Sequence, residues 1–109
     1  LFGGQMVSWM DISASKAVHR FLKKSDADAA LTRAIDAIEF KETVHVGDWV
    51  NFEANIISIG NSSIVINIDA YKESKKIGKT LACTARFTFV SVKKDENGIY
   101  QKINHNQSI

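Results

Sequence analysis

Asp11 is the first charged residue of the chain, and it lies in a segment, residues 1–15, that is otherwise uncharged and mostly apolar. A carboxylate in such surroundings is costly to desolvate unless it has hydrogen-bonding partners. A positioned carboxylate can act as a general base that activates water, or as a nucleophile that attacks an electrophilic carbon. Asp11 is therefore the first candidate for a catalytic group. The alternative is a helix aspartate that faces solvent or makes an interface contact.

Gly3 and Gly4 come immediately before the segment that is predicted to be helical. Two glycines can form a simple turn at a helix start, because glycine adopts backbone conformations that other residues rarely do. The N–H groups at a helix N-terminus also lack partners within the helix and lie at the positive end of its dipole. Gly3 and Gly4 are thus candidate donors to an oxygen that develops negative charge.

Four lysines lie close together in residues 72–79, with Glu73 as the only opposing charge; they are Lys72, Lys75, Lys76 and Lys79. Lysine is a suitable point-charge ligand for phosphate. The cluster could bind a small polyanion, such as the phosphates of a nucleotide-containing molecule. The alternative is the solvated tip of a β-hairpin.

Other common catalytic patterns are missing from the sequence. No G-x-S-x-G motif is present, so a serine nucleophile on a strand-to-helix turn is not indicated. No Cys/His set has the spacing of a zinc site, and no metal or cofactor is predicted. His19, His45 and His105 are scattered along the chain. Cys83 lies in an alternating strand pattern and is predicted to be a core residue, not a nucleophile.

The composition is that of one globular domain. The chain has 109 residues, of which 45% are hydrophobic and 24% charged, and its net charge is +2. This charge is too small for the basic surface of a nucleic-acid-binding protein, and no apolar run reaches the roughly 18 residues that span a bilayer. A single cysteine and the lack of a secretory leader favour a cytoplasmic location. The chain begins at apolar Leu1 without an initiator Met, which predicts that an N-terminal segment precedes it.

A long helix is predicted over residues 5–24. Apolar residues recur there at spacings of three and four, the period of one helix face; they are Met6, Met10, Ala14, Ala17, Val18 and Phe21. Val7, Trp9, Ile12 and Leu22 add apolar residues on other faces. A helix that is apolar around so much of its circumference is predicted to be covered by other structure.

Four strands are predicted after this helix, because the hydrophobic period changes to two. They cover residues 31–40, 49–59, 64–71 and 82–92, with turns at Gly47-Asp48 and at residues 60–63, and a polar hairpin tip at residues 72–79. Asn97-Gly98 marks a further turn, and residues 101–109 are polar and aperiodic, which predicts a loose tail.

This order of elements predicts an α+β fold. Strands joined by short turns pair antiparallel, and a single apolar helix needs a sheet curved around it. That is the hotdog fold, a long central helix wrapped by a curved antiparallel β-sheet; a generic α+β sandwich is the competing arrangement. We expect one hotdog domain over residues 1–98 and a polar C-terminal tail over residues 99–109.

Four segments resemble the acyl-CoA thioester hydrolases of the YciA and brain-type acyl-CoA hydrolase group. Residues 1–11 resemble the family's diglycine, hotdog helix and acidic residue, and residues 44–48 its V-x-V-G-D turn. Residues 60–64 resemble its G-x-S-S-I hairpin, and residues 85–92 its A-x-F-T-F-V-A-V strand. Each motif is weak alone, but four in the right order and spacing are specific. Thr43 stands where the family usually has proline, which should affect loop stiffness only.

The resemblance implies a function for each candidate residue. Asp11 would activate water or attack the acyl carbon, and the N–H groups of Gly3 and Gly4 would hold the thioester oxygen. Ser62 and Ser63 would lie close to the CoA nucleotide, and the nearest candidates for pairing with its phosphates are Lys72, Lys75 and Lys76. The family also implies a dimer as the catalytic unit, often assembled into a hexamer. A first strand and an asparagine would lie upstream of Leu1.

The sequence leaves two alternative functions to be considered. A hydroxyacyl-thioester dehydratase shares the hotdog fold, but its reaction needs a base and an acid, usually His with a carboxylate. No histidine lies near Gly3-Gly4 or within one turn of Asp11, which argues against this reaction. A non-catalytic acyl-CoA-binding module is the second alternative. Acyl-chain preference is not encoded in any recognised motif.

Overall fold

The helix α1 spans Gly3–Phe21 in the computed structural model, which describes residues 3–45, 47–74 and 78–108. Its predicted core face is correct: Met10, Ala14 and Val18 are fully buried. Gly3 and Gly4 lie inside its first turn, not before it as predicted. Their N–H groups still lack intrahelical acceptors, because the first four N–H groups of any helix do.

The helix ends earlier than the predicted Lys24. Ser25 accounts for this end, because both its backbone N–H and its hydroxyl donate to the carbonyl oxygen of Leu22, at 2.9 and 2.8 Å. These hydrogen bonds satisfy a carbonyl that has no partner within the helix. The chain then turns back along the helix and enters the sheet.

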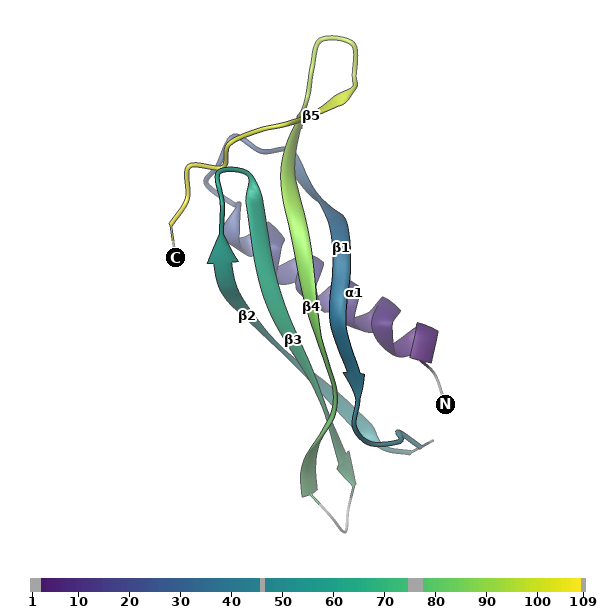
Figure 1. Cartoon of the computed structure of the whole chain (residues 1–109). Coiled ribbons are helices and arrows are strands. Elements are labelled where there is room, and N and C mark those ends of the chain that lie inside the picture. Colours follow the sequence, from purple (N-terminus) through teal and green to yellow (C-terminus); the bar gives the residue numbers. More distant parts are fainter. Residues whose placement is uncertain (1–2, 46, 75–77, 109) are drawn as a thin grey trace.

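Among the described residues, five strands form one antiparallel sheet. They are β1 (Ala29–Phe40), β2 (Trp49–Ile59), β3 (Ser63–Ser74), β4 (Gly78–Lys94) and β5 (Tyr100–Lys102). The long strands are ordered β1-β4-β3-β2, and β5 pairs with the end of β4. Figure 1 shows α1 lying across one face of the four long strands. The predicted hotdog arrangement is therefore present.

The core lies between α1 and the two central strands. Alternate residues of these strands point toward the helix and are buried, as the period of two predicts; they are Ile64, Ile66, Ile68, Ala70, Cys83, Ala85, Phe87 and Phe89. The edge strand β2 is less buried, and Ala54 is exposed. Burial is concentrated where the helix covers the sheet.

The apolar side chains that remain exposed on the single chain include residues of α1 and β1. On α1, Trp9 is 38% and Ile12 52% exposed, so only one face of this helix is covered. On β1, Leu31 and Phe40 are 49% and 57% exposed. Because β1 is an edge strand, its outer backbone groups do not pair within the described chain. An apolar, unpaired edge is typical of a strand that meets another chain.

The predicted loose tail is wrong for the residues that pair with β4 or pack against the rest of the chain, 101–103 and 105. His105 is only 2% exposed, and its ring contacts Phe21 edge-on at 5.7 Å between centroids. The His105 backbone N–H donates to the carbonyl oxygen of Asn61 at 3.0 Å, and the Ser91 hydroxyl donates to the carbonyl oxygen of Ile103. The C-terminal segment therefore packs over the turn between β2 and β3.

No helix among the described residues is both long enough and apolar enough to cross a membrane.

Candidate active site

Asp11 lies at the border between the buried and exposed faces of α1. It follows the fully buried Met10, and its own side chain is partly buried. The Thr32 hydroxyl of β1 donates a hydrogen bond of 2.8 Å to Asp11 Oδ1. This contact joins residues that are 21 positions apart in the sequence, so the fold creates it. Asp11 thus lies on the seam where α1 meets β1.

Thr32 forms a hydrogen bond with one of the two oxygens of the Asp11 carboxylate. Oδ2 accepts no hydrogen bond from the described residues, whereas Oδ1 is held by Thr32. A hydroxyl donor to one oxygen restricts the side-chain rotamer and so orients the second oxygen. That arrangement suits a general base, which must lie within hydrogen-bond reach of the proton that it removes.

A β-bulge directly follows Thr32. The register between β1 and β4 shifts between Thr32 and Ala34, which leaves Arg33 without a partner across the ladder. Bulges increase the local twist of a strand and re-aim nearby side chains. Sequence reasoning missed Thr32, because a threonine inside a β-strand is common and carries no signal of function.

Loss of the Thr32 hydroxyl should lower turnover through the orientation of Asp11. Thr32→Val keeps the shape of the side chain but removes the donor, so we expect kcat to fall about tenfold with little change in KM. Thr32→Ser should restore most of the turnover, because it returns the hydroxyl. Steady-state thioesterase kinetics would check both. An unchanged kcat in Thr32→Val would show that this hydrogen bond does not serve catalysis.

The diglycine and Asp11 are not brought together within one chain. Seven residues separate Gly4 from Asp11 on one continuous helix, which places their backbones about 10 Å apart. Gly4 is exposed, and a Cβ added there would meet no atom within 4 Å. The first helical turn is therefore open to a ligand or to another chain.

Ser62 and Ser63 lie beside the C-terminal end of α1. The Ser62 carbonyl oxygen accepts the N–H of Ser91 at 2.8 Å, and the Ser63 carbonyl oxygen lies 3.3 Å from Nε2 of His105. The two serine hydroxyls make no hydrogen bonds to the described residues. The C-terminal segment thus holds the backbone of this turn while its hydroxyls remain available to a ligand.

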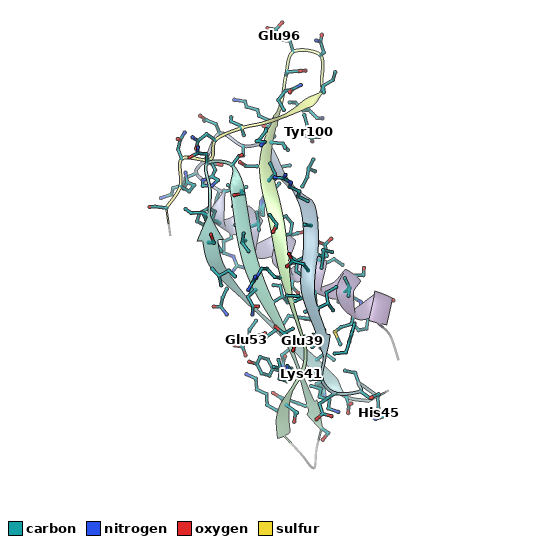
Figure 2. The ribbon with its side chains drawn as sticks, viewed as in Figure 1. Glu39, Lys41, His45, Glu53, Glu96 and Tyr100 are labelled. Atoms are coloured by element: carbon teal, nitrogen blue, oxygen red, sulfur yellow. The ribbon has the colours of Figure 1, made fainter. Side chains whose placement is uncertain are left out.

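Two lysines of the predicted phosphate cluster lie far from the Ser62-Ser63 turn, Lys72 toward the end of β3 and Lys79 at the start of β4. Lys72 Nζ donates to the carbonyl oxygen of Thr43 at 2.6 Å. Lys79 pairs with Glu53 at 2.7 Å, and this hydrogen bond raises the pKa of Lys79. Figure 2 shows Glu53 near the β3–β4 hairpin, at the opposite end of the sheet from Tyr100. Lys75 and Lys76 lie outside the described residues.

Ser63 and Lys72 do not come together within one chain. They are nine residues apart on the same strand, which at about 3.3 Å per residue separates them by about 30 Å. The structure therefore does not place the serine turn and Lys72 around one common point of a single chain.

Cys83 lies in the core, as its alternating strand pattern predicts. Cys83 is fully buried, and this burial raises the pKa of its thiol, which disfavours the reactive thiolate. His19 is exposed on α1, two turns after Asp11, whereas His105 is buried by the C-terminal segment. Within the described ranges, no three His, Cys, Asp or Glu side chains cluster in a way that could hold a metal ion.

Comparisons with known proteins identify the family. The sequence profile of the thioesterase superfamily matches residues 1–79. A protein of Buchnera aphidicola subsp. Acyrthosiphon pisum, named as an acyl-CoA thioester hydrolase, is 36% identical over 98 residues, which cover 86% of this chain and 70% of that protein. A similarly named protein of Haemophilus influenzae is 33% identical, over 90% of this chain and 62% of its own length.

Solved structures agree with the sequence comparisons. The hexameric thioesterase of Yersinia pestis superposes with a TM-score of 0.79 at 31% identity, over 94% of this chain and 80% of that one. A hexameric broad-specificity acyl-coenzyme A thioesterase superposes with a TM-score of 0.78 at 28% identity, over 96% and 70% of the two chains. The profile match alone covers more than half of the sequence, so this chain belongs to the thioesterase superfamily.

Proposed function

We propose that this protein hydrolyses acyl-CoA to a free acid and CoA, with Asp11 as the carboxylate that drives the reaction. The observation that carries this proposal is the Asp11 carboxylate, partly buried on α1 and held through one oxygen by Thr32. The relatives named as acyl-CoA thioester hydrolases support the same substrate class. No cofactor is needed, because CoA is part of the substrate.

The reaction needs two groups at the thioester. Asp11 removes a proton from water as the water oxygen attacks the acyl carbon, or attacks that carbon itself. Negative charge then develops on the carbonyl oxygen, and N–H donors at a helix N-terminus stabilise it. Gly3 and Gly4 are the donors that we assign to this role. Collapse of the intermediate breaks the C–S bond, and the CoA thiolate leaves and takes up a proton. If Asp11 is the nucleophile, the acyl group stays on Asp11 as a mixed anhydride, and water then hydrolyses it to release the free acid and restore the carboxylate.

Two protomers must share each site if these assignments hold. A thioester carbonyl has to lie about 3 Å from both its donor and the attacking group, whereas Gly4 and Asp11 of one helix are about 10 Å apart. Two helices that run antiparallel across a two-fold axis would bring Gly3-Gly4 of one chain to Asp11 of the other. Such a dimer would contain two equivalent sites.

The exposed edge of β1 supports a dimer. Its apolar side chains and outer backbone groups are available for pairing with a second copy of the chain. The exposed Trp9 and Ile12 on α1 offer further apolar surface for association. The hexameric state of the similar thioesterases favours a trimer of such dimers. A cytoplasmic location is consistent with the single cysteine of the chain.

We assign the CoA nucleotide to the Ser62-Ser63 turn and the lysine cluster that contains Lys72, Lys75 and Lys76. The available hydroxyls of Ser62 and Ser63 support this assignment. About 30 Å separates Ser63 from Lys72 on one strand, so both groups can contact the same nucleotide only if they come from different protomers. Kinetics of the two groups of variants therefore test which of them binds.

Charge reversal at Lys72 should weaken CoA binding. Remote phosphate contacts supply binding that is similar in the ground and transition states, so Lys72→Glu should raise KM several-fold and leave kcat nearly unchanged. Lys102→Glu, on β5, is the matched control. An unchanged KM in Lys72→Glu, with a raised KM in Ser62→Ala, would assign the nucleotide to the serine turn alone.

Product analysis distinguishes the proposed hydrolysis from the alternatives. Incubation with acyl-CoA should release free thiol, which a thiol reagent detects. A dehydratase acting on hydroxyacyl-CoA would instead form an enoyl product and release no thiol. A binding module would give neither, although calorimetry would still detect its complex with acyl-CoA. Binding without thiol release by full-length protein would overturn the proposed function.

A further inference from the structure

A cavity of about 350 Å³ lies between the C-terminal half of α1 and the start of β1. Its lining includes the apolar side chains of Leu22 and Phe89, which are 6% and 1% exposed, and the partly buried Ala30. Exposed polar and charged side chains also line it; they are Ser15, His19, Lys23 and Asp28. The cavity therefore offers an apolar floor with a polar rim, which suits a hydrocarbon chain attached to a polar group.

This cavity lies along the same interface between α1 and β1 that contains Asp11. Ser15 and His19 follow Asp11 at intervals of four residues, so the three side chains share one side of α1. Ala30 and Thr32 are two residues apart and share one face of β1. Four helical residues and two strand residues each advance by about 6 Å. Since Thr32 touches Asp11 and the two elements run in opposite directions, Ser15 lies at the level of Ala30.

We propose that this cavity binds the acyl chain of the substrate, and that Ala30 keeps it open and thereby sets the preferred chain length. The proposal rests on the proposed function, because hydrolysis by Asp11 requires the acyl carbon to lie beside the Asp11 carboxylate. The acyl chain then runs along α1 toward His19, over Leu22 and Phe89. Ala30 lies about 7 Å along β1 from Thr32, so it faces the middle of the chain.

The distance along α1 from Asp11 to His19 favours a medium-chain acyl group. These residues are eight positions apart, so they are separated by about 12 Å. An extended chain advances by about 1.2 Å per atom, a third of the 3.3–3.6 Å that each peptide residue spans, so about ten carbons fit this length.

A series of acyl-CoA substrates tests this assignment. For the wild type, kcat/KM should rise with chain length to about ten carbons and then level off. Ala30→Leu should block the cavity about six carbons from the thioester. Each buried CH₂ contributes about a fourfold factor in binding, so kcat/KM for decanoyl-CoA should fall at least tenfold relative to butyryl-CoA. Ala54→Leu, at an exposed position of β2, should leave this ratio unchanged.

Ala30→Val guards against misfolding of the larger variant. Valine is favoured in strands and should give a smaller shift in the same direction; thermal melting checks that both variants fold. A folded, active Ala30→Leu or Ala30→Val protein with the wild-type chain-length profile would overturn the acyl cavity and leave the proposed hydrolysis intact. If wild-type protein releases no thiol from any acyl-CoA, the proposed function falls first, and the assignment of the cavity falls with it.

Discussion

Asp11→Asn should lower kcat for acyl-CoA hydrolysis by about 10²–10⁴-fold, the usual contribution of a general base. Asparagine has nearly the same shape as aspartate and can still accept the hydrogen bond from Thr32. It cannot take a proton from water at neutral pH, and it is a poor nucleophile. The loss should therefore appear in kcat, and KM should change little.

The stability of the protein should be nearly unaffected by this change. Asp11 is partly exposed and makes one side-chain hydrogen bond, to Thr32, which asparagine can keep. Loss of such a bond would cost only about 1 kcal/mol. Asp26→Asn, at an exposed position after α1, is the matched control and should retain wild-type kcat. Near wild-type turnover by a folded Asp11→Asn protein would remove Asp11 from the mechanism.

Activity should return when two inactive variants exchange subunits. One variant is Asp11→Ala, and the other is Gly4→Pro, which removes one N–H donor. Proline is tolerated in the first turn of a helix, where the lost N–H has no intrahelical partner. If the site is shared, a heterodimer combines the intact Gly4 of one protomer with the intact Asp11 of the other. It then has one working site, compared with two in the wild-type dimer.

Subunit exchange should restore a defined fraction of the activity. Random exchange of equal amounts makes about half of the dimers mixed, each with one of two sites intact, so total activity should approach about a quarter of wild type. Asp11→Ala mixed with Asp11→Asn is the matched control: exchange between these two variants leaves no intact Asp11, so no activity should return. Mass spectrometry of the native protein would verify exchange. If mixed dimers form and no activity appears, the shared site is wrong.

The main elements of the fold were predictable because they follow from hydrophobic periodicity. The helix face of Met10, Ala14 and Val18 and the alternating core residues of β3 and β4 were correctly predicted. The ends of the strands were predicted less accurately. The hairpin of β3 and β4 extends to Ser74 and Gly78 because backbone hydrogen bonds continue through polar residues, which carry no hydrophobic signal.

The C-terminal segment shows why the local sequence pattern did not predict an ordered structure there. Residues 101–109 are polar and aperiodic, so no local property indicates order. His105 is buried because its ring meets Phe21 and its backbone N–H meets Asn61, and both partners lie far away in the sequence. Burial of a polar residue depends on such tertiary hydrogen bonds, which a sequence pattern does not contain.

For the site, the sequence by itself indicated Asp11 as a candidate. A lone charge in an apolar segment costs free energy to desolvate, so it is retained either for a function or because it has a hydrogen-bonding partner. The sequence also indicated the diglycine at the helix start and the turn at Ser62-Ser63. Only the tertiary structure decided that Thr32 is the partner of Asp11, and that a cavity continues from this pair along α1 and β1. Both depend on how a helix lies against a strand, and periodicity specifies which face is buried but not which residues meet across the seam.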